Sequence, residues 1–262
     1  ALYQFYTAGF NAFAVICIIP IFIPIIYAVF TWQMLAFWGL VVMNYLIQWF
    51  SKNQWLPLPI SMYNELLELL LIGVALLDIR QTSYFDRIGN LMFFALSVWC
   101  GFCTLEVLND TCDLGISVPN WYAGARLMAF QILEGYLVFV LYISTPDRLN
   151  KYIKVIAFLS LFSVFYTWKQ INIGFTPMEN AWMQNVGKTT HILNGGTLIR
   201  YFSTHNDAAN YGINAASTAI MFFILAITTR LKKDRIFYVV TAVLITWGMF
   251  QSGTRTAIFC MA

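Results

Sequence analysis

The chain has 262 residues, of which 60% are hydrophobic and only 10% are charged. Soluble globular domains carry roughly 25% charged residues, so this composition excludes an ordinary soluble enzyme and indicates a membrane protein. The formal net charge of +3 is small and scattered along the chain, which argues against a nucleic-acid partner.

Apolar segments of helical length follow one another along the chain. Residues 10–50 contain no charged side chain, and a span needs about 20 apolar residues, so this stretch can cross a bilayer twice. Helices are expected over 10–30, 33–50, 60–77, 88–107, 122–144, 153–168, 208–229 and 236–252, with another from about 256. We predict an all-α, polytopic transmembrane helical bundle of eight or nine spans, forming one domain over residues 1–262.

The two ends of the sequence indicate a piece of a longer protein. The chain begins at Ala1 and ends with "AIFCMA", just inside another apolar segment. The first apolar block is too long for the core of a signal peptide and no basic segment precedes it. We therefore expect functional residues on the C-terminal side of residue 262.

Lys and Arg predict the orientation in the membrane, because cytoplasmic connections carry an excess of them. The connections 78–88, 146–154 and 230–235 hold nine of the 15 basic residues and alternate correctly with the helices. These connections are predicted to be cytoplasmic, which places 51–59, 108–121 and 169–207 outside. The N-terminus then also lies outside, so either an earlier helix is missing or the first block does not fully cross.

Three arginines stand at the opposite, outer boundary. Arg126 precedes cytoplasmic Arg148 by 22 residues, and Arg255 follows cytoplasmic Arg235 by 20 residues. At 1.5 Å per residue these separations are about 33 and 30 Å. Arg200 stands just before the helix predicted over 208–229. Snorkelling to the outer headgroups explains any single arginine, but three at one level favour an anion site.

The densest polar segment is "LIRYFSTHNDAANYG", residues 198–212. It holds Arg200, His205, Asn206, Asp207 and Asn210 between apolar segments. Asn206 or Asp207 is the expected N-cap of the following helix, whose positive end would point into the same region. Guanidinium groups and a helix N-terminus together suit a phosphate or pyrophosphate at the outer leaflet.

Two motifs in this part of the chain resemble the O-antigen ligase and O-antigen polymerase (Wzy-C-like) superfamily. "RYFSTHNDAANYG" is followed, after one helix and a basic turn, by "LITWGMFQSGTRTA". Members carry an Arg and a short Asn-containing turn before one helix, then an S-x-[ST]-R-x-A-like turn after the next. Upstream, "LPISMYNELLELLL" and "WYAGARLMAFQILEGYLVFV" are also similar to the family. The resemblance covers roughly residues 56–262, and the last seventy are the most specific.

The resemblance implies a GT-C-like membrane glycosyltransferase in the bacterial inner membrane, with its active site on the extracytoplasmic side. Such enzymes move a glycan from an undecaprenyl-pyrophosphate donor to an acceptor hydroxyl on lipid A-core, a polysaccharide or a protein. The phosphate-binding arginines carry over to Arg200 and Arg255, and also to Arg126. The substrate-binding set is completed by Asn206, Asp207, Asn210 and Glu134.

His205 is the candidate general base, because its ordinary pKa lies near the working range. The alternative is a residue that orients the loop by hydrogen bonding. His205 stands where the family more often has proline, and the spacing from Arg200 to Gly212 is one residue longer than in some polymerases. In the ligases the catalytic histidine lies in a later outer loop, which falls beyond residue 262.

No cofactor or metal is expected. The chain has two histidines and no D-x-D motif, which is a poor ligand set. Preorganised arginines would instead stabilise the charge that develops on the leaving pyrophosphate.

Intramembrane acids supply the alternative function, an ion-coupled transporter. Glu134 is expected in the middle of its helix, and Glu65 and Glu68 share one helical face. In the glycosyltransferase they would pair with arginines such as Arg126, and Gln131 would join them. Transporters favour midplane sites in repeated halves, and this sequence shows no repeat.

Two further features have a structural and a chemical interpretation. "CGFC" at 100–103 indicates two small packing residues one turn apart, or a Cys103–Cys112 bridge at the outer face. Trp121, Trp168 and Trp182 lie near the outer boundary, where most tryptophans are interfacial anchors. Trp182 is also a candidate for stacking on a sugar.

Overall fold

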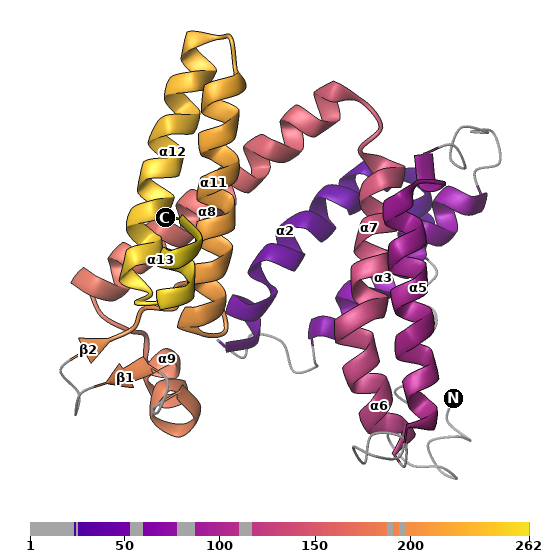
Figure 1. Cartoon of the computed structure of the whole chain (residues 1–262), viewed down its shortest axis with the longest axis horizontal. Helices are drawn as coiled ribbons and strands as arrows, with labels where there is room; N and C mark the ends of the chain where they lie inside the picture. Colours follow the sequence, from indigo (N-terminus) through magenta and orange to yellow (C-terminus); the bar gives the residue numbers. More distant parts are fainter. Residues whose placement is uncertain are drawn as a thin grey trace. The chain divides into compact units, whose positions relative to one another are not determined.

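A computed structural model describes residues 24, 26–52, 60–77, 87–109, 117–187, 191–193 and 198–261 (Figure 1). The chain divides into two compact units. Unit 1 comprises 1–41 and 61–146, and unit 2 comprises 42–60 and 147–262. The prediction of one transmembrane domain over residues 1–262 stays a prediction.

The described residues form an all-α structure with one short β-hairpin, which confirms the predicted class. The helices of the first half are α2 (Gln33–Lys52), α3 (Ile60–Leu77), α5 (Leu91–Leu105), α6 (Val118–Ala125) and α7 (Gln131–Tyr142). Those of the second half are α8 (Pro146–Asn172), α9 (Pro177–Trp182), α11 (Ala208–Thr228), α12 (Lys232–Gln251) and α13 (Arg255–Met261). The strands are β1 (Ile192–Leu193) and β2 (Leu198–Ile199), paired antiparallel with Ile192 opposite Ile199.

Five of the described helical segments are long and apolar enough to cross a membrane, as expected of a multi-pass membrane protein. They are Gln33–Lys52, Leu91–Leu108, Val118–Tyr142, Pro146–Asn172 and Ala208–Thr228. This count is below the eight or nine spans predicted from the sequence. Most of the first predicted helix lies outside the described residues, α12 begins with the charged tetrapeptide KKDR, and α13 is described over seven residues.

Unit 1 is built around the contact of α2 and α3 with α7 and the pairing of α5 with α6 and α7. Phe37 of α2 stacks on Tyr142 of α7, with 5.4 Å between ring centroids, and the Tyr142 hydroxyl donates to the Leu71 carbonyl at 3.0 Å. Cys100 and Cys103 pack as buried thiols in α5, as the packing interpretation predicted. Cys112 lies outside the described residues.

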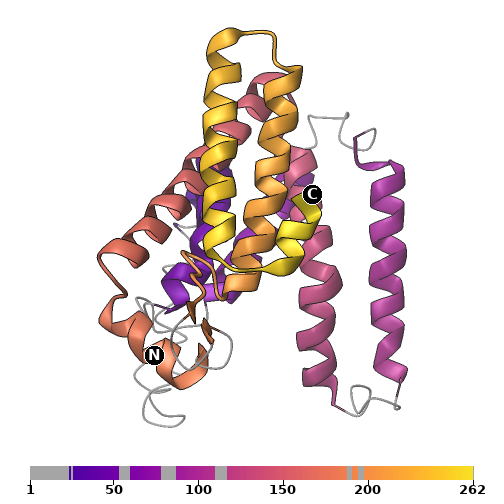
Figure 2. The same ribbon diagram turned by 60° about the vertical axis from the view of Figure 1, so that its left-hand side comes forward.

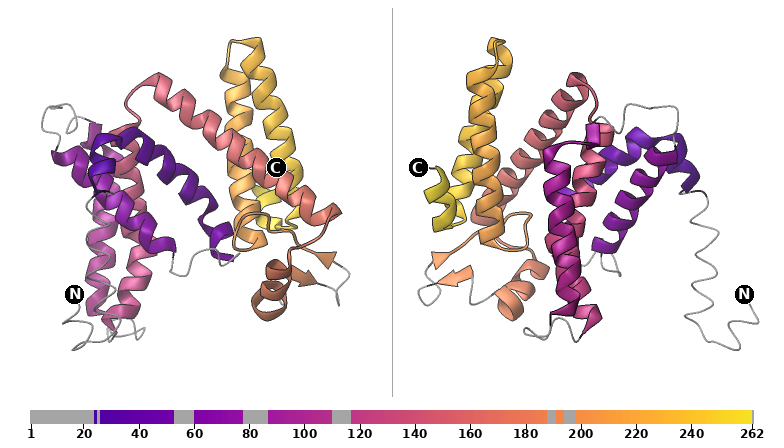
Figure 3. Two further views of the ribbon diagram at one scale, coloured as in Figure 1. Left: turned by 180° about the vertical axis from the view of Figure 1, so that it is seen from behind. Right: turned by 45° about the vertical axis from the view of Figure 1, so that its right-hand side comes forward.

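Unit 2 is organised by the antiparallel hairpin of α11 and α12 (Figure 2). Small residues on the buried face of α11, including Ala215 and Ala219, let the two helices approach closely. Figure 3 shows α9, β1 and β2 at the end of this hairpin away from the α11–α12 connection. The outer faces of both helices expose large apolar side chains such as Ile227 and Val243, as lipid-facing surfaces do.

Two local predictions were wrong in their boundaries. The basic residues of 146–154 lie in the first turns of α8 and not in a loop. Pro146 begins this helix, because the first helical position does not need a backbone N–H. The outer segment 169–207 is not a plain loop either, because it holds the end of α8, then α9 and the β-hairpin. A capping box of Thr176 and Glu179 begins α9.

Candidate functional site

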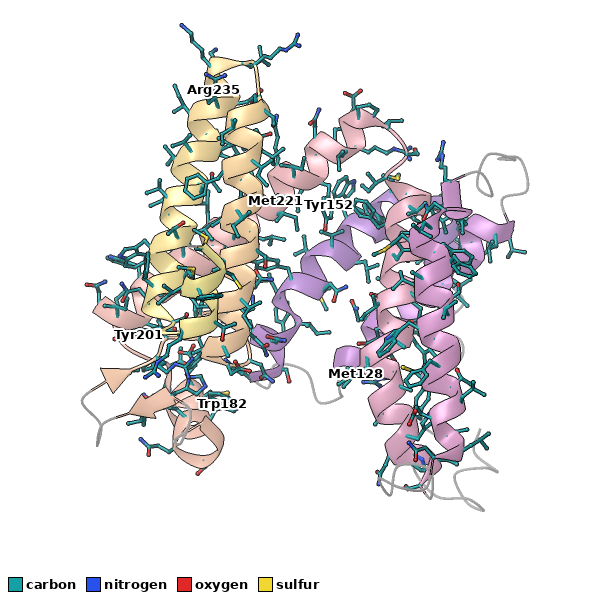
Figure 4. The ribbon with its side chains drawn as sticks, viewed as in Figure 1. Met128, Tyr152, Trp182, Tyr201, Met221 and Arg235 are labelled. Carbon is teal, nitrogen blue, oxygen red and sulfur yellow. The ribbon has the colours of Figure 1, made fainter. Side chains whose placement is uncertain are left out.

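The polar motif and the basic turn lie at opposite ends of unit 2. Figure 4 shows Trp182 and Tyr201 at one end of the α11–α12 hairpin and Arg235 at the other. The 21 residues of α11 between these ends span about 31 Å, close to the thickness of a bilayer core. In the orientation predicted from the sequence, Arg235 lies at the cytoplasmic end and Tyr201 at the outer end, and these two names are kept for the ends of unit 2.

The two sequence motifs meet at this outer end through Arg200. Its Nε donates to the Ser252 carbonyl oxygen at 3.1 Å, and its Nη2 donates to Thr254 Oγ1 at 3.1 Å. Both partners belong to the turn after α12, and Tyr201 N also donates to the Gln251 carbonyl at 3.2 Å. Thr254 Oγ1 in turn donates to the Ala208 carbonyl at 2.9 Å, which ties the turn to the start of α11.

Glycines allow this close approach. A Cβ atom at Gly212 of α11 would lie 2.5 Å from Ser252 Oγ and 2.7 Å from the Thr254 Cβ. Gly253 has a φ of 61°, in the left-handed region that favours glycine. A residue with a side chain at either position would strain the turn that holds Arg200.

The segment after Arg200 is fixed by buried hydrogen bonds. Ser203 adopts a φ of 52°, which is uncommon for a residue other than glycine. Gln170 accepts from Ser203 N at 3.0 Å and donates to Glu179 Oε1 at 2.8 Å. The Ser203 hydroxyl donates to the Ser163 carbonyl at 2.5 Å. These contacts with α8 and α9 hold the strained turn in place.

His205 lies inside this segment rather than on its surface. Only 8% of the residue is exposed, and its ring packs against Tyr45 and Tyr211 at centroid distances of 5.8 and 5.3 Å. Burial, and then the positive charge of Lys52, lower the pKa of His205 to about 4. The imidazole is therefore neutral at pH 7 and a weak base, which favours the loop-orienting interpretation over general-base catalysis.

The neighbouring polar residues have structural contacts of their own. Asp207 is the N-cap of α11, as predicted, and accepts from Asn210 N at 2.8 Å. The side-chain amide of Asn210 donates a second hydrogen bond to Asp207 Oδ2 at 2.8 Å. Asn206 is exposed, and its backbone N–H donates to Gln48 Oε1 at 2.7 Å. Because Asp207 already caps the helix, the N-terminus of α11 is less open to a bound anion than the sequence suggested.

Two residues near Arg200 were missed as site residues. Lys52 was assigned only to an outer loop, yet it ends α2 with 7% exposure and donates to the His205 carbonyl. Its Nζ lies 3.6 Å from the Phe202 ring centroid and 4.6 Å from that of Trp182. One sequence feature could have identified Lys52 as a site residue, because it is the first charged side chain after the charge-free residues 10–50.

His191, the second missed residue, directly precedes β1 and holds the backbone of Arg200. Its carbonyl accepts from Arg200 N at 2.9 Å, and its Nδ1 lies 3.2 Å from the Arg200 carbonyl oxygen. The ring is enclosed by Trp182 and Phe202, and burial lowers its pKa. His191 therefore fixes the backbone position from which the Arg200 side chain extends.

Of the other predicted arginines, Arg255 joins this end of unit 2 and Arg126 is described in unit 1. Arg255 is exposed and directly follows Thr254, the partner of Arg200. Arg126 pairs with Glu65, with 3.0 Å between Nε and Oε1. Because Arg126 belongs to unit 1 and the other two arginines to unit 2, the convergence of all three on one ligand stays a prediction.

The acids named for the transporter lie in unit 1. Glu65 also accepts from Gln131, as expected for members of one network, and Asn64 donates to Glu68 at 2.9 Å. Glu134 of α7 is partly buried. Pairing with Arg126 neutralises Glu65 without a transported ion, as the structural interpretation of these acids expected.

An open cleft of about 500 Å³ adjoins the site in unit 2. It is lined by Ser51, Lys52, Pro177, Met178, Ala181, Trp182, Asn185 and Asn206. Lys52 and Asn206 thus border both the cleft and the segment that carries Arg200. An aromatic wall with a few polar groups is the usual composition of a small-molecule site.

Comparisons with protein-family models, with curated proteins and with solved structures found no match. Among the described residues, no three His, Cys, Asp or Glu side chains are grouped so as to hold a metal ion. Arg200, its turn and the adjoining cleft are therefore the features from which a function is inferred.

Proposed function

We propose that the chain is part of a membrane glycosyltransferase that takes a glycan from an undecaprenyl-pyrophosphate donor at the extracytoplasmic face. The observation that carries this proposal is the hydrogen bonding of the Arg200 guanidinium to the turn that precedes Arg255. It brings two motifs that are about fifty residues apart together at one end of unit 2, which supports a shared cationic site there. A lipid-linked pyrophosphate lies at that depth, with its prenyl tail in the bilayer.

The chemistry is an inverting displacement at the anomeric carbon. An acceptor hydroxyl forms the new C–O bond as the bond to the pyrophosphate breaks, and the bonding electrons leave with the pyrophosphate. The hydroxyl proton passes to the departing pyrophosphate, directly or through water. Arg200 and Arg255 stabilise the negative charge that develops there, which preorganised cations do without a metal ion. A GT-C-like arrangement of the complete protein belongs to this proposal.

Transfer from a synthetic prenyl-pyrophosphate-linked glycan in proteoliposomes tests the proposal. Arg200→Ala and Arg255→Ala should each reduce the rate by about 100-fold or more, since loss of one such donor costs that much in other enzymes. Arg200→Lys should recover only part of the rate, because an ammonium lacks the bidentate fork. Arg235→Ala, at the other end of unit 2, is the matched control and should transfer at the parental rate.

Parental transfer by Arg200→Ala or by Arg255→Ala would refute the proposal. Ion-coupled uptake into the same proteoliposomes, lost in Glu134→Gln, would instead favour the transporter.

A further inference from the structure

We propose that the cleft between α9 and the end of α2 binds the glycan of the donor, with a preference for a sugar that carries a carboxylate. This inference rests on the proposed function, because it assigns the sugar-binding part of the same site. The cleft volume of about 500 Å³ is in the range of small-ligand sites and accommodates about two sugar rings.

The walls of the cleft offer the contacts that sugars need. Trp182 supplies an indole surface against which the C–H groups of a sugar ring pack, and part of its side chain remains exposed. Ser51, Asn185 and Asn206 are exposed along the cleft and provide hydroxyl and amide groups for sugar hydroxyls. Phe202 and His191 hold the Trp182 ring edge-on at 5.3 Å each, so the indole is preorganised.

Lys52 is the reason to expect an acidic sugar. Its ammonium group is buried against Phe202 and Trp182 and donates to the His205 carbonyl, and among the described residues no carboxylate lies within ion-pair distance of it. The charges of Glu179 and Asp207 act on this ammonium from beyond ion-pair distance, and with the aromatic faces and the carbonyl they replace its lost hydration only in part. Lys52 also lines the cleft, where a ligand carboxylate would complete its coordination.

The position of the cleft agrees with a donor that occupies both subsites. Asn206 borders the cleft six residues after Arg200, on the short segment that Gln170 and Ser163 hold rigidly. The inference places the first sugars of the donor in this cleft while Arg200 and Arg255 bind its pyrophosphate. The two subsites use different residues, so each is tested separately.

The experiment measures binding of two matched disaccharides to the purified protein in nanodiscs: a glucuronic-acid-containing disaccharide and its neutral glucose counterpart. The parent should bind the acidic sugar about tenfold more tightly or better, the usual gain from one charged hydrogen bond. Lys52→Met should abolish this preference, and Lys154→Met, an exposed lysine in α8, should keep it.

Trp182 and the cleft volume are tested by a second set of variants. Trp182→Ala should weaken both disaccharides about tenfold or more, whereas Trp168→Ala, an exposed tryptophan outside the cleft, should bind like the parent. Ala181→Phe fills the cleft from its exposed wall without removing Lys52 or Trp182, so it should block binding of both disaccharides. This variant tests the cleft even if Trp182→Ala does not fold.

The inference is overturned if Lys52→Met retains the preference for the acidic sugar, or if Ala181→Phe binds like the parent. Arg200→Ala separates this inference from the proposed function, because it should lose transfer yet bind the disaccharides normally. Normal transfer by Arg200→Ala overturns the proposed function, whatever the disaccharides do.

Discussion

Gly212→Ala should destabilise the protein, although the same change stabilises most helices. In a helix interior alanine is favoured over glycine by up to about 1 kcal/mol. Here the new methyl group would lie 2.5 Å from Ser252 Oγ and 2.7 Å from the Thr254 Cβ. Ser252 is fully buried and its hydroxyl donates to the Met249 carbonyl at 2.6 Å, so neither atom can move away freely. Overpacking of this kind costs about 1–3 kcal/mol.

The melting temperature of the purified protein measures this effect. A net loss of about 1–2 kcal/mol lowers the Tm of a chain of this size by roughly 2–8 °C. Gly101→Ala is the matched control, because no atom lies within 4 Å of a Cβ at that position in α5. It should melt at the parental temperature or slightly above it. A Gly212→Ala protein as stable as the Gly101→Ala protein would refute the packing that holds the Arg200 turn.

Three more outcomes follow from the same contacts. Thr254→Val removes the acceptor of Arg200 Nη2 and the donor to the Ala208 carbonyl. It should lower the free energy of unfolding by about 1–3 kcal/mol and reduce the rate of transfer. Thr254→Ser keeps the hydroxyl and should preserve both the stability and the transfer rate. The unfolded chain binds more protons than the folded one between the ordinary His pKa of 6.5 and the His205 pKa of about 4. Stability should therefore fall by up to about 3 kcal/mol as the pH drops through this range, and His205→Gln should flatten that part of the Tm profile; identical profiles would contradict the assigned burial. Transfer should persist in EDTA, and a strict requirement for added Mg²⁺ or Mn²⁺ would contradict catalysis by arginines alone.

The sequence predicted what depends on periodic apolar patterns and on local chemistry. The helix expected over 208–229 is observed as Ala208–Thr228, with Asp207 as its cap. These features depend on neighbours within a few residues, so a single sequence contains the information. The hydrogen bonds of Arg200 to the 252–254 turn bring the two motifs together, and the shared anion site predicted for the three arginines stays a prediction.

Lys52 and His191 could not be placed in the same way. Lys52 reaches the His205 carbonyl across 153 residues, and no local pattern encodes a pairing between the end of one helix and a loop so far along the chain. His191 depends on a two-residue β-hairpin, which is too short to give an alternating pattern. The extent of α8 was missed for another reason, since basic residues at a membrane boundary fit a loop and a helical first turn equally well.

Under the proposed function, the distribution of polarity in unit 2 limits where a lipid-linked donor could be recognised. Along α11 and α12 the outward side chains are apolar, as at Ile227 and Val243, which are 80% and 54% exposed. A prenyl tail beside these helices gains little from contact with them, because lipid solvates it as well as apolar side chains do. If the proposed function holds, discrimination between donors comes from the outer end, where Arg200 would bind the pyrophosphate and the cleft beside Lys52 would bind the sugar. A protein built this way should tolerate changes in tail length far better than changes in the first sugars.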